Sequence, residues 1–257
     1  MPKQKLKSYQ IKYRLYLMIK KTIFFFLVFK SLFLYSSNPL PKDSLTGNFD
    51  LGLNFTKNTE STFQFNNISL LKYQKGKSSL SFGNNIAFIS KTGESELLNK
   101  GMQDFKYALN LKKIDINFTL NHTYDISRSI KHRYGTGVGI TYNLTDKDDK
   151  KIGFGVSAIR EKNIPLKGEE KLQNRMSGNF DLLFKLNNHV SLTTSNLYQP
   201  NIEAIGDFRW QTNLSLRIFL YSHFALSINS IFNYDSFPEK GIPETDYQLI
   251  NSISYTF

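Results

Sequence analysis

The chain has 257 residues, with 33 lysines and arginines, 21 aspartates and glutamates, and no cysteine. The absence of cysteine excludes disulfide frameworks, thiolate catalysis, cysteine-ligated zinc and a cysteine-anchored lipoprotein. The 24 asparagines and only 5 alanines disfavour helices and suit β-strands joined by polar turns.

The excess of basic residues is concentrated at the N-terminus. Residues 1–37 contain eight lysines and arginines and no acidic residue, which leaves 25 basic against 21 acidic residues, a net +4, in the rest of the chain. A net charge this small does not indicate a polyanionic partner, so nucleic acid is not expected as a ligand.

The N-terminal residues have the order of an export signal. Two lysines precede the apolar run 22–29, Lys30 interrupts the apolar character, and the segment ends on small residues up to Ser37. This order predicts a signal peptide over residues 1–37. Met18 is an alternative start, which would give a signal of ordinary length.

The alternative for this segment is an uncleaved membrane anchor. A bilayer-spanning helix needs roughly 20 apolar residues, and Lys30 breaks a run that is already shorter than this. No apolar run after residue 37 approaches that length, and the mean hydropathy of the chain is −0.35. Export is therefore predicted, without a second membrane helix.

From residue 48 to the C-terminus, apolar side chains recur at every second position. The clearest segments are 48–56, 104–112, 115–125, 133–144, 179–186, 208–220, 224–234 and 246–257. Four less regular segments are 61–73, 78–91, 151–160 and 190–198. Because a period of two places alternate side chains on opposite faces of a strand, the chain is predicted to form about twelve β-strands.

The length of these strands favours a membrane barrel over a soluble sandwich. Strands of about ten residues, tilted near 45°, cross a hydrocarbon layer, whereas strands of soluble sheets are nearer five or six residues. Twelve strands with an apolar face would also need a partner layer that the chain does not contain. We therefore expect an all-β, antiparallel, up-and-down transmembrane barrel over residues 46–257, preceded by a short periplasmic segment, 38–45.

The predicted connections alternate in length. Tight connections fall at 74–77, 112–113, 187–189 and 221–223, with a modest one at 145–151. Longer loops fall at 92–101, 160–171, 198–206 and 235–245. Short periplasmic turns and long extracellular loops are typical of bacterial outer-membrane barrels, and an even strand number would place both termini in the periplasm.

The chain ends on an aromatic residue in an alternating strand. Leu249, Ile253, Tyr255 and Phe257 stand at alternate positions, although Asn251 interrupts the apolar series. Tyr255 and Phe257 resemble the C-terminal signal by which the assembly machinery recognises outer-membrane barrels.

The chain from residue 46 onward resembles the salt-induced outer-membrane protein family, a domain of unknown function. The resemblance rests on the opening segment 47–59 and on the closing residues Pro238, Gly241 and Asp246 with the final strand. The family has a tryptophan near its first strand, where this chain has only Phe49. The resemblance implies the fold and location but supplies no catalytic residues and no substrate.

The inward face of the predicted barrel carries both signs of charge. The candidate lumen-lining residues are Asp50, Asp104, Lys106, Lys112, Asp115, Asp125, Arg133, Arg175, Asp181, Lys185, Arg209 and Arg217. Eight strands are filled by their own side chains and sixteen leave a wide channel, so twelve strands permit either a narrow polar passage or a closed interior with paired charges. Seven cationic and five anionic groups indicate no strong ion selectivity.

Catalytic and metal-binding patterns are weak. His122 follows Phe118 and Leu120 on the apolar face, where an outer-membrane phospholipase would place a histidine, but no recognisable serine motif accompanies it. A girdle histidine beside Tyr124 is the simpler interpretation. The carboxylates of Asp146 and its neighbours lack the spacing of a calcium loop, so no metal and no cofactor are expected.

Two further motifs, one acidic and one rich in glycine, have plain structural interpretations. Asp148 and Asp149 belong to a solvated turn between flanking lysines. Gly135, Gly137 and Gly139 alternate with larger residues, as strand glycines that face the lumen would, and no helix follows them to complete a nucleotide site.

The sequence therefore predicts a non-enzymatic outer-membrane barrel with a role in envelope integrity, in the salt or osmotic response, or as a pore for small solutes. Two alternatives stay open: a lipid-modifying enzyme that uses His122, and an adhesin or receptor that acts through the longer loops. The expected partners are outer-membrane lipid and lipopolysaccharide, the barrel assembly machinery and small solutes.

Overall fold

The computed structural model describes residues 43–57, 61–91, 97–147 and 149–257. The predicted signal peptide, including Met18, and the segment up to residue 42 lie outside the described residues. Among the described residues, no helix has the length and apolar character needed to cross a membrane.

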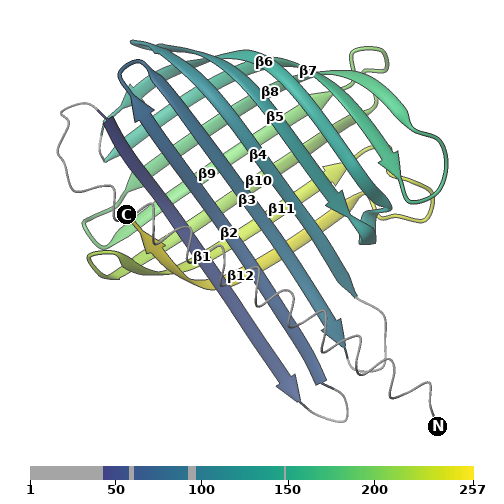
Figure 1. Cartoon of the computed structure of the whole chain (residues 1–257), viewed down its shortest axis with the longest axis horizontal. Coiled ribbons are helices and arrows are strands. Elements are labelled where there is room, and N and C mark those ends of the chain that lie inside the picture. Colours follow the sequence, from purple (N-terminus) through teal and green to yellow (C-terminus); the bar gives the residue numbers. More distant parts are fainter. Residues whose placement is uncertain (1–42, 58–60, 92–96, 148) are drawn as a thin grey trace. The chain divides into compact units, whose positions relative to one another are not determined.

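The described chain forms a closed barrel of twelve strands (Figure 1). The strands are β1 Asp43–Lys57, β2 Ser61–Lys75, β3 Ser78–Lys91, β4 Leu98–Leu111, β5 Ile114–Asp125, β6 Ile130–Asp146, β7 Lys150–Pro165, β8 Lys171–Lys185, β9 Val190–Pro200, β10 Phe208–Tyr221, β11 Phe224–Asp235 and β12 Thr245–Thr256. One turn of 3-10 helix, η1 Ile126–Arg128, separates β5 from β6. The first strand begins at Asp43, three residues before the predicted boundary of the barrel.

Each strand pairs antiparallel with its neighbours in sequence, and β1 closes the ring on β12. The predicted all-β, up-and-down barrel of about twelve strands is therefore confirmed. Since the strands alternate in direction, the start of β1 and the end of β12 lie at the same end of the barrel.

The alternation in the sequence separates the two faces of the wall. Outward side chains such as Leu53, Val138 and Ile253 are apolar and expose 64%, 61% and 62% of their surface. Inward side chains such as Asp50 and Ser254 are polar and fully buried. A strand with period two can satisfy both environments at once, so the barrel has an apolar exterior around a polar lumen.

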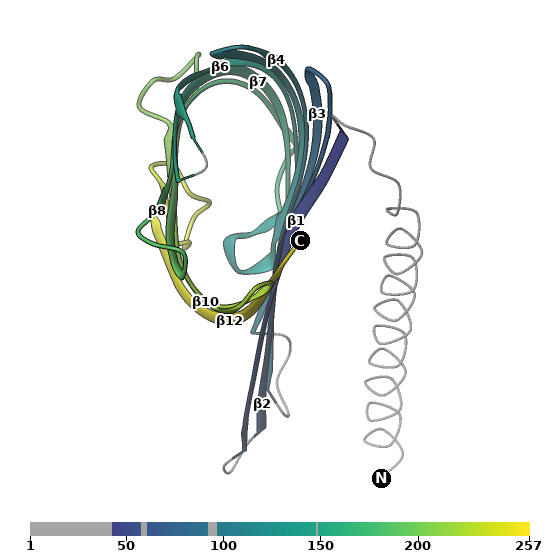
Figure 2. The ribbon, with the colours of Figure 1, turned by 90° about the vertical axis from the view of Figure 1, so that its left-hand side faces the viewer.

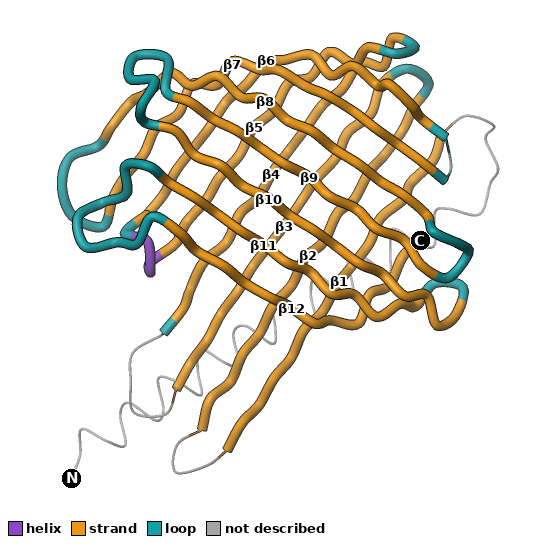
Figure 3. The backbone as a smooth tube through the Cα atoms, turned by 180° about the vertical axis from the view of Figure 1, so that it is seen from behind, coloured by secondary structure: helices purple, strands orange, loops and turns teal. Residues whose placement is uncertain are grey.

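The connections differ between the two ends of the barrel. The end that holds the barrel termini, here called the short-turn end, has tight turns at 76–77, 112–113, 186–189 and 222–223. The opposite end, here called the long-loop end, has η1 and the loops 166–170, 201–207 and 236–244 (Figure 3). Positive φ angles of 56° at Gly76 and 57° at Lys112 make two of the turns tight.

Two of the predicted outer loops are longer than those in the structure. Residues 160–171 were expected to form a long outer loop, but β7 continues to Pro165 and the ladder to β8 extends as far as the pair Asn163–Lys171. The charged run that begins at Arg160 resembles a loop in sequence, yet its alternate members Glu161 and Asn163 are buried on the inward face. Charged residues can belong to a strand of this barrel because their side chains face a polar lumen. Loop 92–101 also ends early, because β4 begins at Leu98; residues 92–96 lie outside the described residues.

On the lumen side of β6, glycines leave room for atoms of the neighbouring strands that come very close to the backbone. A Cβ added to Gly137 would lie 2.7 Å from the Thr119 hydroxyl, and one added to Gly139 would lie 2.5 Å from the Val156 carbonyl. Only glycine fits at such approaches, so these residues are structural parts of the strand.

The ring closes through a short seam. β1 and β12 pair only from Asn48 to Leu51, opposite Thr256 to Ile253, whereas β1 pairs with β2 along its whole length. Within the described chain, β1 beyond Leu51 has no partner on β12, and Figure 2 shows β1 and β2 continuing beyond the ring of the other strands.

Candidate functional site: an arginine cluster in the lumen

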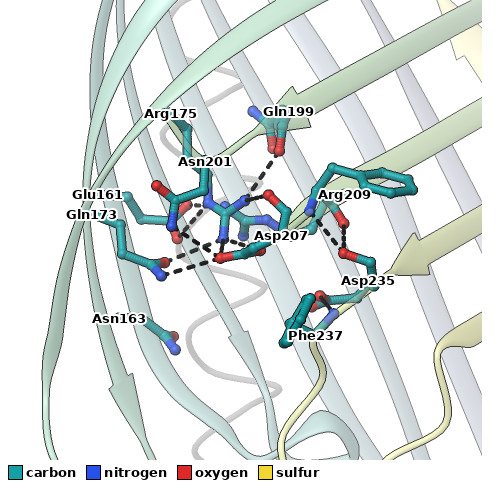
Figure 4. A network of polar contacts seen from close by, with 12 residues as sticks. Glu161, Asn163, Gln173, Arg175, Gln199, Asn201, Asp207, Arg209, Asp235 and Phe237 are labelled. Carbon is teal, nitrogen blue, oxygen red and sulfur yellow. Dashed lines mark hydrogen bonds and ion pairs between the residues drawn. The ribbon is translucent and has the colours of Figure 1, made fainter. Parts of the chain in front are cut away.

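Glu161 on β7 is the centre of a charged cluster inside the barrel, near the long-loop end (Figure 4). Its carboxylate lies 2.5 Å from Arg209 Nη2, 3.7 Å from Arg133 Nε and 3.8 Å from Arg175 Nε. The Glu161 side chain exposes only 7% of its surface. Three guanidinium groups therefore share one buried carboxylate, and this set is called the arginine cluster below.

The strand register explains two of these contacts. Arg133 on β6 pairs with Asn163, two residues from Glu161, and Arg175 on β8 pairs with Ile159 on the other side of it. Arg209 is different because β8 and β9 separate its strand, β10, from β7. The Arg209–Glu161 ion pair thus bridges strands that do not touch, across the curve of the lumen.

Arg175 is the most engaged member of the arginine cluster. Its Nη2 donates to both carboxylate oxygens of Asp207, at 2.8 and 2.9 Å. Its Nη1 donates to the backbone carbonyls of Gln199 and Asp207, at 3.1 and 3.3 Å. Because this side chain is 96% buried and bonded to the loop, it holds loop 201–207 against the wall.

Asp207 is held in its ionised form. Burial acts to raise the pKa of Asp207, but hydrogen bonds from Arg175 and Asn201 and the nearby positive charges outweigh it and leave the pKa below its ordinary value. The Asn201 amide donates at 3.0 Å. The Arg175–Asp207 pair is therefore a fixed structural contact.

Arg133 is the least engaged member. Its Nε donates to Asn163 Oδ1 at 3.4 Å and faces Glu161. No residue in the described part of the chain accepts a hydrogen bond from its Nη1 or Nη2. The planar end of this side chain is thus available inside the lumen.

Two cavities meet at Arg133. One has a volume of about 510 Å³ and opens among the loops of the long-loop end, and the other, of about 210 Å³, lies toward β4 and β5. The residues that line both are Arg128, Ile130, Arg133, Arg209 and Asp235. Two members of the arginine cluster, Arg133 and Arg209, therefore border both cavities.

The other predicted lumen residues that belong to strands lie on the inward face but do not join this cluster, whereas Lys112 lies in the turn between β4 and β5. Asp50 and Arg217 pair with each other at 3.2 Å. Asp115 accepts a hydrogen bond from Asn143 at 2.9 Å, and Asp181 accepts one from Ser195 at 2.6 Å. Within the described part of the chain, three residues face inward without such a contact: Asp104, Lys106 and, at the end of β8, Lys185.

Sequence reasoning missed Glu161, Asp207 and the cation Lys100. Lys100 falls within the predicted loop 92–101, but it lies on β4, and its Nζ is 2.8 Å from Asp246 Oδ2 on β12. Glu161 was assigned to the loop 160–171. Gly153 and Gly155 face the lumen, as does every second residue after them on the same strand. Extending this alternation to position 161 would have identified Glu161 as a lumen residue.

His122 lies on the outward face with other aromatic and polar groups. Its ring stacks on Tyr134 at 4.8 Å, its Nδ1 lies 3.0 Å from Gln103 Oε1, and its Nε2 lies 3.1 Å from His132 Nδ1. Both ring nitrogens are thus engaged by an amide and an imidazole, and no hydroxyl contacts them in the described chain.

The carboxylates of the acidic turn after β6 do not gather around a common position. Asp146 forms an ion pair with Lys151 at 2.8 Å, with both side chains exposed, and Asp148 lies outside the described residues. Over the described ranges, no group of three or more histidine, aspartate or glutamate side chains could hold a metal ion.

The C-terminal aromatics lie at the seam. Phe257 exchanges backbone hydrogen bonds with Gly47 at 2.9 and 3.0 Å, and Tyr255 contacts Phe224 with ring centroids 5.2 Å apart. The residues predicted to form the assembly signal therefore also complete the closing strand pair.

Comparison with solved structures finds similar barrels at very low identity. The chain is similar over 84% of its length to 96% of the NanC porin, with 10% identity and a TM-score of 0.46. It is similar over 87% of its length to 98% of an outer membrane channel from Pseudomonas putida F1, with 11% identity and a TM-score of 0.46. For the KdgM porin the coverage is 82% and 99%, the identity 11% and the TM-score 0.43.

No curated protein shows significant sequence similarity to the chain. A family model does match, over residues 49–257, which is nearly the whole barrel. The chain therefore belongs to the family described as "Protein of unknown function, DUF481".

Proposed function

We propose that this protein is an outer-membrane pore that lets small hydrophilic solutes pass along its lumen. The observation that carries the proposal is the pair of cavities, about 510 and 210 Å³, that meet inside the wall at Arg133 and Arg209. A barrel filled by its own side chains would leave no such space. Arg133 and Arg209 line both cavities, so charged side chains border this space.

The exterior of the barrel supports its placement in a membrane. Large apolar side chains such as Phe82, Phe105 and Phe118 are exposed on the outward face of neighbouring strands. Lipid would remove this surface from water, and the closed ring leaves few unpaired backbone groups. The proposed orientation has the short-turn end in the periplasm and the long-loop end outside, in contact with lipopolysaccharide.

The cellular role that we propose follows from such a pore. Passage of small solutes would serve envelope integrity or a salt and osmotic response, the roles expected from the sequence. The signal peptide predicted over residues 1–37 would export the chain, and Tyr255 and Phe257 would be recognised by the barrel assembly machinery.

Conductance across a planar bilayer tests the proposal. The purified barrel is first refolded and checked for heat-modifiable migration on a gel, which distinguishes closed barrel from unfolded chain. Discrete current steps from the folded fraction are the expected result. A folded, heat-modifiable barrel that carries no current in KCl would contradict the pore function.

A further inference from the structure

We infer that Arg133 is the contact point in the lumen for one carboxylate group of a passing solute, so that small hydroxylated monocarboxylates, such as sugar acids, are the solutes that the pore favours. This inference rests on the proposed pore function and names the class of solute. The observation behind it is the difference in hydrogen-bond partners among the three arginines of the arginine cluster.

The arginine cluster has more cations than anions that bind them. Both carboxylate oxygens of Asp207 accept hydrogen bonds from Arg175 Nη2, and the shortest contact of the Glu161 carboxylate is with Arg209. Arg133 keeps only its Nε in contact with Glu161, at 3.7 Å. One guanidinium group is therefore left without a carboxylate of its own.

The free part of Arg133 has the geometry that binds carboxylates. A guanidinium group donates two parallel hydrogen bonds to a carboxylate, and such charge-assisted pairs are stronger than neutral ones. The Nη1 and Nη2 of Arg133 make no hydrogen bond within the described chain. Because Arg133 lines both cavities, a solute in either cavity comes within reach of it.

The surroundings of Arg133 indicate which carboxylates fit. The larger cavity, about 510 Å³, is within the range of small-molecule sites. Asn163 and Asp235 also line it, and an amide and a carboxylate accept hydrogen bonds from hydroxyl groups. The negative charge of Asp235 opposes a second anionic group on the solute, so a monocarboxylate is favoured over a dicarboxylate.

The experiment compares glucuronate with glucose, which differ at C6 and in charge. Binding to the detergent-solubilised barrel is measured by titration calorimetry, and block of the KCl current is measured in a planar bilayer. The variants are Arg133→Gln and, as a matched control, Arg160→Gln. Arg160 is an exposed arginine on the opposite face of β7 that bonds to Asn174 at 2.9 Å.

The expected result is that wild type and Arg160→Gln bind glucuronate in preference to glucose, and that Arg133→Gln loses this preference. The loss should be about tenfold or more, the size that a charge-assisted bidentate contact supplies. Equal glucuronate affinity in Arg133→Gln and wild type, or no preference in wild type, would overturn the inference.

The design keeps this inference separate from the pore function. Current that is present but equally sensitive to glucuronate in wild type and Arg133→Gln retains the pore and overturns the Arg133 site. If the folded barrel carries no current, the pore function fails and calorimetry still decides the site. If Arg133→Gln does not fold, the Arg133→Lys variant is used, because it keeps the positive charge but cannot donate two parallel hydrogen bonds from a planar guanidinium group. Weaker glucuronate binding by this variant supports the site, and unchanged binding overturns it.

Discussion

The carboxylate of Asp50 on β1 lies 3.2 Å from Arg217 Nη2 on β10 and accepts a hydrogen bond of 2.5 Å from the Ser254 hydroxyl on β12. Asp50 is 99% buried. One side chain thus links the first strand to two strands near the end of the chain, at the place where the barrel closes through four residue pairs.

Replacing Asp50 should therefore weaken barrel closure. We expect Asp50→Asn to lower the free energy of unfolding by about 1–3 kcal/mol, because Arg217 loses its carboxylate partner in a place with little access to water. Urea titration of the refolded barrel, followed by the loss of heat-modifiable migration, measures this. Asp146→Asn, which removes an exposed ion pair with Lys151, is the control and should change stability by less than about 0.5 kcal/mol. Equal stability of the two variants would show that Asp50 does not hold the seam.

Replacing Glu161 should change the selectivity of the pore. Glu161→Gln removes the carboxylate that all three arginines of the cluster contact, so the lumen gains positive charge. We expect the reversal potential in a KCl gradient to move toward that of chloride. Glu170→Gln, at an exposed pair with Lys162, should leave the reversal potential unchanged. A shift of the same size in both variants would place the effect outside the lumen.

The attachment of loop 201–207 should depend on pH in the acidic range. The folded pKa of Asp207 lies below its ordinary value, so the folded state binds protons less readily than the unfolded chain. The stabilisation is then complete above the unfolded pKa, about 3.9, and is lost as the pH falls through the lower folded value.

Limited proteolysis at loop 201–207 measures this dependence. Wild type should stay protected down to about pH 4, when an acid-active protease is used. Asp207→Asn should be cleaved at every pH tested, because the neutral amide cannot replace the two hydrogen bonds to Arg175. Protection of the variant equal to that of wild type at neutral pH would contradict the docking role of this pair.

Val138→Arg tests whether the outward face meets lipid. Val138 is 61% exposed on β6, and an arginine at the middle of a lipid-facing strand costs roughly 2–4 kcal/mol. Urea unfolding in lipid vesicles should show a loss of that order. Ile205→Arg, at a loop residue that is 77% exposed, should be nearly neutral. In water both sites are simply exposed, so two neutral variants would argue against the membrane placement.

The fold could be predicted from sequence because its signal is local and repeated. The alternation of apolar and polar residues, as at Phe105, Tyr107 and Leu109, can be recognised within a single strand, and the same pattern recurs in strand after strand. The turns follow from the same pattern, since each begins where the alternation stops. The charged end of β7 was misread because inward-facing Glu161 and Asn163 give a strand the polarity of a loop.

The arginine cluster could not be predicted in the same way. Arg133, Arg175 and Arg209 were expected to line the lumen, but their shared partner lies up to 48 residues away, as for Arg209 and Glu161. Which inward residues meet across strands that do not pair depends on the tilt and curvature of the whole ring. These are properties of the closed barrel that no single segment encodes.

The short seam also has a consequence for the order of folding. β1 and β12 are the paired strands that lie farthest apart in sequence, with Asp50 and Ser254 separated by 204 residues. Joining these two strands therefore carries the largest entropic cost of closure in the barrel. The hairpins between neighbouring strands close short loops and form at lower cost. We therefore expect the twelve-stranded sheet to assemble as an open ribbon whose two edges join last, and the same joint to part first when the barrel unfolds.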